Sequence, residues 1–185
     1  DVIEYLFAAS THSYILIFTD RGKVYWLKVY QIPQGSRGSR GKPIVNLLPL
    51  EGDERISAVL PIKDFMTGES VFFVTCQGVV KKTELEAFSR PRANGIIALA
   101  LRDDDALVGA ALTDGTRDIL LVADNGKGIR FPEENVRTMG RTAAGVRGMK
   151  LGKGQAVISL LICQDGDVLT MSEAGFGKRT LVDEY

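Results

Sequence analysis

Short apolar runs that lead into a glycine turn and continue into basic residues recur four times along the chain. The copies span residues 14–30, 71–88, 118–136 and 168–185. Their turn glycines are 56, 48 and 49 residues apart, at Gly22, Gly78, Gly126 and Gly175. A repeat of about 50 residues indicates one supersecondary unit that is used several times. The sequence therefore predicts one continuous array over residues 1–185.

Each repeat continues beyond the hairpin with the same order of segments. A second glycine follows the turn glycine after 17 to 19 residues, at Gly41, Gly95 and Gly145. An acidic or glycine-rich turn comes next, at residues 51–54, 103–105 and 152–155. A further apolar run then follows, at residues 56–62, 107–113 and 157–163. About four strands per repeat predict an all-β array of propeller-like, four-stranded blades.

The type of run indicates where the strands lie. Residues 71–74 and 119–122 are continuously apolar, which predicts strands that are covered on both faces. Asn125-Gly126 is a signal for a type I′ hairpin turn. Residues 83–88 and 132–136 predict a short helical turn at most, and no long helical period is present in the sequence.

The composition, with 45% hydrophobic and 25% charged residues, is that of an ordinary globular protein. No stretch approaches the roughly 18 apolar residues of a membrane helix, so no membrane partner is expected. The chain begins at Asp1 without a Met, and we expect it to be part of a longer polypeptide. Cys76 and Cys163 lie within apolar runs, which is typical of buried thiols in a reducing cytoplasm.

The placement of charge is more informative than its sum, because 23 Lys and Arg residues balance 23 Asp and Glu residues. The third and fourth positions after the turn glycine carry cations in three of the four repeats, at Lys81, Lys82, Arg130, Lys178 and Arg179. More cations surround the second glycine, at Arg37, Arg40, Lys42, Arg90, Arg92, Arg137, Arg141 and Arg147. Equivalent positions of an array form a stripe, so these cations predict a basic rim that could hold a phosphate backbone.

Two classes of binding module remain open from charge placement. Solvated charges scattered over any soluble surface would also give these counts, and a propeller could then serve as a platform for protein interactions. A module that binds the nucleic-acid backbone needs no helix to read bases, and glycine-rich, arginine-rich turns suit close approach to phosphates. Salt dependence separates the two classes, because phosphate contacts release counterions.

No catalytic, metal-binding or cofactor-binding residue is expected in the chain. The segment GFGKRT, residues 175–180, suggests a phosphate loop, but Ser172 stands in place of the first glycine and Arg179 in place of the Ser or Thr. His12 is the only histidine, and Asp103 to Asp105 are interpreted as a solvated turn, which leaves little for a zinc site or a triad. Trp26 is assigned to blade packing.

Several longer motifs carry a more specific resemblance. They are YILIFTDRGKVYWLKVYQIPQGSRGSRGKPIVNLLPL (14–50), GIIALAL (95–101), LVGAALTDG (107–115), MGRTAAGVRGMKL (139–151) and GFGKRT (175–180). In this order and spacing, essentially the whole chain resembles the C-terminal DNA-wrapping domain of the bacterial DNA gyrase A subunit. The C-terminal domain of the topoisomerase IV A subunit is the near neighbour, and the elements at 25–29 and 42–48 favour gyrase.

The resemblance implies a β-pinwheel, a propeller-shaped disc whose blades exchange strands with their neighbours. Residues 1–185 would hold about three full repeats and two partial ones. Double-stranded DNA would bend around the basic perimeter and so guide ATP-dependent negative supercoiling by a type IIA topoisomerase. ATP and Mg²⁺ would act elsewhere in that enzyme, and this fragment would need no cofactor.

The resemblance also implies partners and a location. The partners would be DNA, the remainder of the gyrase A subunit, and the gyrase B subunit in an A2B2 assembly, with no small-molecule substrate. The location would be the bacterial cytoplasm, in association with the nucleoid. The gyrase box of the family, a Gln-Arg-Arg-Gly-Gly-Lys-Gly-type loop, would lie just before a strand expected to begin near Ile3, so we expect this chain to start too late to contain it. That strand start lies outside the residues that the structure describes. QGSRGSRGK, residues 34–42, has a similar composition but is not the box.

Overall fold

The computed structural model describes residues 5–36 and 38–185, and the all-β prediction is confirmed. Its first strands are β1 (Tyr14–Thr19), β2 (Lys23–Lys28), β3 (Ile56–Ile62), β4 (Ser70–Thr75), β5 (Val79–Glu84), β6 (Ile96–Ile97) and β7 (Leu107–Thr113). The later strands are β8 (Asp118–Ala123), β9 (Gly128–Pro132), β10 (Val146–Arg147), β11 (Val157–Ile162), β12 (Asp167–Met171) and β13 (Gly177–Leu181). Single 3-10 turns join them at η1 (Val29–Gln31), η2 (Ile44–Asn46), η3 (Leu85–Phe88), η4 (Glu133–Asn135) and η5 (Val182–Glu184). The short helical turns predicted at residues 83–88 and 132–136 are therefore present, as η3 and η4.

Each complete blade is a hairpin that borrows a strand from the next repeat. The first sheet has the order β3-β1-β2-β6, in which β6 comes from the second repeat. The second has the order β10-β5-β4-β7, in which β10 comes from the third repeat. The remaining sheets are β11-β8-β9 and β12-β13. The strand exchange of a β-pinwheel is confirmed.

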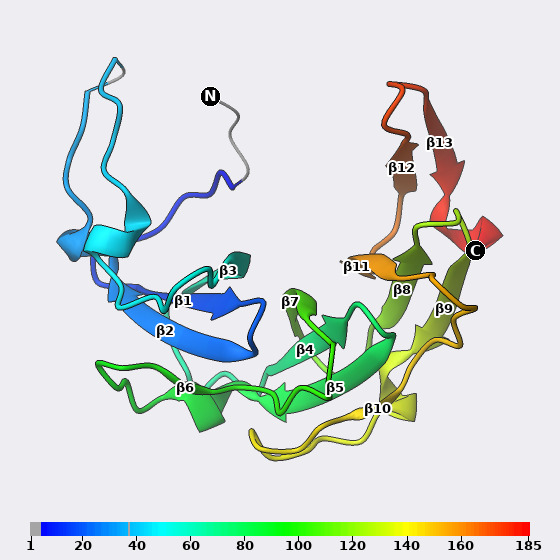
Figure 1. Ribbon diagram of the computed structural model, residues 1–185, viewed down its shortest axis with the longest axis horizontal. Coiled ribbons are helices and arrows are strands. Elements are labelled where there is room, and N and C mark those ends of the chain that lie inside the picture. The colour runs from blue at the N-terminus through cyan, green and yellow to red at the C-terminus, as the bar shows by residue number, and fades with distance from the viewer. Residues whose placement is uncertain (1–4, 37) are drawn as a thin grey trace.

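The four sheets follow one another around an open arc (Figure 1). Strands β3, β7 and β11 lie on its inner side, and β7 contacts both of the others. The segments that contain β6 and β10 run along the outer side. The β1–β2 hairpin lies at one end of the arc and the β12–β13 hairpin at the other. The outer side between them is one continuous curve.

Apolar side chains from neighbouring blades fill the space between the sheets. Leu16 and Phe18 of β1 pack against Val71 and Phe73 of β4, and all four are fully buried. The rings of Phe18 and Phe73 meet edge to face with centroids 5.2 Å apart, a geometry that aromatic pairs prefer. Phe72, on the other face of β4, packs toward the third blade. The continuously apolar runs are thus strands covered on both faces, and each buried side chain of this kind contributes about 1.5–3 kcal/mol.

The turn glycines of the first two hairpins join adjacent blades. Gly22 has a φ of +71°, and its carbonyl accepts hydrogen bonds from the amides of Ala98 at 2.8 Å and Leu99 at 3.1 Å. A Cβ at Gly22 would lie 2.5 Å from the Leu99 carbonyl oxygen. The Gly78 carbonyl accepts the same pair of bonds from the amides of residues 148 and 149. Glycine is required there both by the left-handed φ and by the approach of the next repeat.

The type I′ turn predicted at Asn125-Gly126 is wrong in type, although its position is right. A type I′ turn needs a positive φ at both central residues. Among the described residues, Asp104 is the only non-glycine with a positive φ. Instead, the Gly126 amide donates to the Ala123 carbonyl at 2.9 Å, and glycine is the last of three connecting residues. A three-residue connection of this kind is the next most common hairpin loop.

Candidate nucleic-acid interface

Three segments that follow a 3-10 turn, and that end before the acidic or glycine-rich turn leading to the next inner strand, lie at the outside of the blades. We call them the first, second and third straps, and they span residues 32–50, 89–101 and 136–151. The second strap contains β6 and the third contains β10, so each lies across the outer edge of the preceding blade (Figure 1). The first strap projects from the first blade at one end of the arc.

Glycines allow the second and third straps to lie directly on the blades beneath them. Gly95 has a φ of +68°, and a Cβ on it would lie 2.7 Å from a ring carbon of Tyr25. Gly145 has a φ of +85°, and a Cβ there would lie 2.5 Å from the Val80 carbonyl oxygen. The second glycine of the second and third repeats is therefore the place where a strap touches the neighbouring hairpin, and any side chain there would lift the strap away.

Most cations of the straps are exposed and have no acidic partner. Six of the predicted strap cations are exposed and form no ion pair with any described residue; they are Arg40, Lys42, Arg90, Arg92, Arg137 and Arg147. Arg141 is half-buried, and its Nη1 donates to the Ile97 carbonyl at 3.3 Å. Arg37 lies outside the described residues. Lys150 is exposed at the end of the third strap and was missed, although it follows Arg147 in the same acid-free segment.

Charge is strongly segregated although the chain is neutral overall. The three straps together contain nine Lys and Arg residues and no Asp or Glu. Because the formal net charge of the chain is zero, the rest of it carries nine more acids than bases. An acid-free row of cations gives a positive potential along one side of a molecule, and such a row attracts polyanions.

Lys81 and Lys82 do not contribute to this exposed row, and this corrects the prediction that they line the rim. Lys81 is completely buried, and its Nζ lies 2.6 Å from the Ala98 carbonyl oxygen. Lys82 is 8% exposed, and its Nζ lies 3.1 Å from the Glu133 carbonyl oxygen. Both ammonium groups point at backbone carbonyls of the straps and turns, so they tie blades together.

The fourth position after the turn glycine has one shared role in three repeats, whatever residue occupies it. Trp26 Nε1 donates to the Phe88 carbonyl at 2.8 Å, in η3 of the second repeat. Lys82 donates to the Glu133 carbonyl in η4 of the third repeat, and Arg130 Nη1 to the Val182 carbonyl in η5 of the fourth, at 2.7 Å. Each side chain links its blade to the 3-10 turn of the next one. Trp26 is thus an inter-blade donor.

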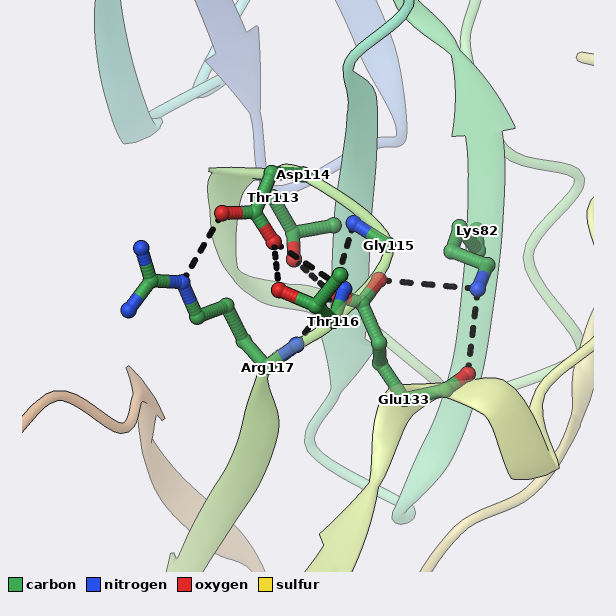
Figure 2. A network of polar contacts seen from close by, with 7 residues as sticks. All are labelled: Lys82, Thr113, Asp114, Gly115, Thr116, Arg117 and Glu133. Atoms are coloured by element: carbon green, nitrogen blue, oxygen red, sulfur yellow. Dashed lines mark hydrogen bonds and ion pairs between the residues drawn. The ribbon is translucent and has the colours of Figure 1, made fainter.

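Lys82 also belongs to a buried polar network around Glu133 (Figure 2). The fully buried Glu133 carboxylate accepts hydrogen bonds from the amides of Gly115 at 3.0 Å and Arg117 at 2.9 Å, and from the Thr113 hydroxyl. The Lys82 ammonium lies 3.5 Å from its second oxygen. Donors surround both oxygens of this carboxylate, which makes a buried charge tolerable.

The chain resembles known proteins over its whole length. The family described as the DNA gyrase C-terminal domain, beta-propeller, matches residues 13–63, 69–114, 117–164 and 166–185. The chain belongs to this gyrase C-terminal domain family. It is 53% identical over 186 aligned residues to the DNA gyrase A subunit of Salmonella typhimurium, and 50% identical to that of Escherichia coli K12. All of this chain is covered, but only 21% of each relative, so it spans about a fifth of their length.

Solved structures of related domains have the same fold. The crystal structure of the C-terminal domain of DNA topoisomerase IV superposes with a TM-score of 0.86 at 32% identity. It covers 95% of this chain, which spans 55% of that one. A structure of a DNA gyrase A C-terminal domain gives a TM-score of 0.79 at 26% identity, with 95% and 56% coverage. The predicted family resemblance is confirmed.

The remaining cations of the gyrase-family hairpins have acids beside them. Arg130 Nε lies 2.8 Å from Asp118 Oδ2, and its Nη1 lies 3.1 Å from Asp183 Oδ1. In the last hairpin, Arg179 is exposed and lies 3.1 Å from Asp167 Oδ2, whereas Lys178 is exposed without an ion pair to the described residues. The straps therefore hold seven exposed cations that form no ion pair with the described residues, whereas most hairpin cations lie in ion pairs or against backbone carbonyls.

Among the described residues, no group of three or more His, Cys, Asp or Glu side chains could hold a metal ion. Within the same part of the chain, no helix is long and apolar enough to cross a membrane.

Burial raises the pKa of the Cys76 thiol, and a hydrogen bond to Asp105 raises it further, which disfavours a reactive thiolate. The GFGKRT segment is the tip and second strand of the β12–β13 hairpin.

Proposed function

We propose that this domain binds double-stranded DNA along its straps and bends it around the outer side of the arc. One observation carries the proposal: the straps hold nine cations and no acid in a chain of zero net charge. Contacts between Lys or Arg and phosphates supply most of the non-specific affinity for DNA. Cations that follow a curved protein surface would hold successive phosphates of a bent duplex, as wrapping proteins do.

The contacts would address the DNA backbone and leave the bases unread. The described residues include no α-helix that could enter the major groove. Arginine guanidinium groups bind phosphates with two parallel hydrogen bonds, and glycine-rich straps allow main-chain amides to approach them closely. Sequence preference would then reflect how easily a given duplex bends.

Within the whole protein, we propose that the domain is the non-catalytic wrapping module of DNA gyrase, a type IIA topoisomerase. Family membership and identities near 50% to gyrase A subunits support this role. Bent DNA would present a second duplex segment to a cleavage site elsewhere in the enzyme, where ATP and Mg²⁺ also act. Its partners in the bacterial cytoplasm would be the rest of the gyrase A subunit, together with the gyrase B subunit.

The test compares two quadruple alanine variants that remove equal charge. The strap variant changes Arg90, Arg92, Arg137 and Arg147, and the control changes Arg55, Lys63, Lys127 and Lys153, which are exposed outside the straps. Duplex affinity is measured over a salt series. Each phosphate contact contributes about 0.9 to the magnitude of the slope of log K against log salt. The slope of the strap variant should therefore be smaller in magnitude by about 3 to 4. The control should keep its slope.

Two outcomes would reject the proposal. Equal losses in both variants would mean that DNA responds only to overall charge. Absence of duplex binding at low salt in the unaltered protein would favour the alternative of a protein-interaction propeller. The topoisomerase IV alternative is tested separately. The domain is joined to the remainder of the gyrase A subunit, the gyrase B subunit is added, and ATP-dependent negative supercoiling is measured.

A further inference from the structure

One buried cation joins the second strap to the third. Lys81 extends from β5, and its Nζ donates to the Ala98 carbonyl of the second strap at 2.6 Å. On its other side the same Nζ donates to the Arg141 carbonyl and to the Ala143 carbonyl, at 3.3 Å, in the third strap. An ammonium has three N–H donors, and they meet three carbonyls here. A single side chain therefore spans both straps.

The two straps are also linked in the opposite direction. Arg141 donates from its guanidinium to the Ile97 carbonyl at 3.3 Å, while its own carbonyl accepts from Lys81. Beneath them, β10 pairs with β5, so that Val146 lies opposite Val80. The second strap thus ends where the third begins to cross the blade, and Lys81 is under this junction.

The charge of Lys81 is held without a carboxylate. No described acid forms an ion pair with it, and the charged group beside it is the Arg141 guanidinium. Burial, and then the nearby Arg141 charge, lower the pKa of Lys81 to about 8. The centroid of the Phe73 ring lies 5.8 Å from the Nζ. The carbonyl dipoles of the straps are what stabilise this cation.

The equivalent position makes no such bridge between straps in the other repeats, so the junction is specific to the second blade. Tyr25 occupies it in the first repeat and donates to Glu54 Oε2 at 3.0 Å, within its own blade. Ile129 occupies it in the third repeat and is exposed. Lys178, in the fourth, is exposed. A lysine cage under two straps is therefore present at one place of the described arc.

We propose that Lys81 is a positioning residue of the DNA interface, which touches no phosphate and fixes the spacing between the cations of the second and third straps. Arg90 and Arg92 belong to the second strap, and Arg137 and Arg147 to the third. The part of this proposal that concerns DNA rests on the function proposed above. The part that concerns the junction does not need DNA.

The junction is tested first, by hydrogen exchange in Lys81→Met, with the exposed Lys153→Met as the matched control. In the unaltered protein the amides of Ala98 and Leu99 bond to Gly22, and those of residues 148 and 149 bond to Gly78. Loss of Lys81 should speed exchange at both pairs by tenfold or so, since local opening requires their bonds to break. Acceleration in only one strap, or in neither, would overturn the proposal.

A measurement on the unaltered protein covers the case in which Lys81→Met does not fold. The Lys81 ammonium should give a slowly exchanging nitrogen signal in NMR, with couplings through hydrogen bonds to carbonyl carbons in both straps. That signal should titrate near pH 8. A rapidly exchanging ammonium, or coupling to one strap alone, would rule out the bridge.

The DNA role is tested by comparing bend and salt dependence. Lys81→Met should reduce the bend of a bound duplex, measured by energy transfer between its ends, and leave the salt slope unchanged. Arg92→Ala should instead lower the slope by about 0.9, as one phosphate contact is lost. A slope loss of that size in Lys81→Met would mean direct contact and overturn the positioning role, and so would an unchanged bend.

The pH profile gives a readout that a purely structural lysine would not move. Above its pKa, Lys81 has two N–H donors for three carbonyls, so the bend should decrease between pH 7 and 9 with a midpoint near 8. Lys153→Met should keep this profile and Lys81→Met should lose it. If the unaltered protein binds no duplex, the proposed function fails and the DNA role falls with it, while hydrogen exchange still decides the junction.

Discussion

The Lys82 ammonium lies 3.5 Å from a carboxylate oxygen of Glu133, and the two residues belong to different blades. Their side chains are 9% and 0% exposed, so this ion pair is screened little by solvent. The Glu133 carboxylate in turn accepts hydrogen bonds from two amides of the loop between β7 and β8. One pair therefore connects the second hairpin to the third blade and to its entry loop.

Glu133→Gln should strongly destabilise the domain. It leaves the Lys82 cation buried without a countercharge, and breaking such a pair typically costs about 3–5 kcal/mol. The free energy of unfolding in urea measures the effect. Exchanging Lys82 for Met at the same time should recover much of the loss, because neither charge then remains. Glu134→Gln, next to it and exposed, is the control, and a loss there of equal size would argue against the buried pair.

Gly78→Ala should cost more than Gly126→Ala, although both glycines have nearly the same φ, +76° and +79°. The left-handed φ alone costs about 1–2 kcal/mol for alanine. At Gly78 the added Cβ would also lie 2.7 Å from the Met149 carbonyl oxygen, whereas nothing lies within 4 Å at Gly126. Thermal unfolding of both variants measures the difference. Equal losses would show that the third strap does not press on this turn.

Tyr25 should make stability decrease at alkaline pH. Burial, and then the hydrogen bond to Glu54, raise the pKa of Tyr25 from 10.0 to about 12. Below pH 10 its phenol is protonated in both states, and between 10 and 12 only the unfolded chain loses the proton, so the folded state is disfavoured as pH rises. The difference in unfolding free energy between the unaltered protein and Tyr25→Phe should shrink from about pH 10 upward. A constant difference would contradict the raised pKa.

Trp26→Phe should loosen the contact between the first and second blades. The Phe88 carbonyl, in a buried residue, loses the indole donor 2.8 Å away, and an unsatisfied buried acceptor costs about 1–3 kcal/mol. Urea unfolding gives the loss. Because Trp26 is the only tryptophan, its fluorescence in the unaltered protein reports the same contact. If Trp26→Phe is as stable as the unaltered chain, the indole is not an inter-blade donor in solution.

The repeated strands and the turn positions were predictable because they depend on local pattern. Continuous apolar runs and a glycine at a fixed interval are properties of neighbouring residues in the sequence. The strap cations were also predictable, since no acid accompanies them in the sequence. Assignment to gyrase relied on longer motifs, and the family match confirms it.

The burial of Lys81 and Lys82 was not predictable from their own segment. Two adjacent lysines are normally solvated, and here their carbonyl partners lie in segments up to 62 residues away. One signal was available for Lys82. The seventh position after the turn glycine is apolar in three repeats, as Val29, Leu85 and Val182, but it is Glu133 in the third. An acid at a position that is apolar in the other repeats indicates a buried cation in the repeat before it.

The borrowed strands β6 and β10 separate the unit of sequence from the unit of structure. A gene segment that encodes one repeat would supply most of one sheet and the last strand of the sheet before it. Removing a repeat would therefore open the edge of a blade whose own sequence is intact, and unpaired edges invite aggregation. A domain with a different number of blades would then fold only if the repeat after each blade supplies a strap whose strand pairs with the edge of that blade.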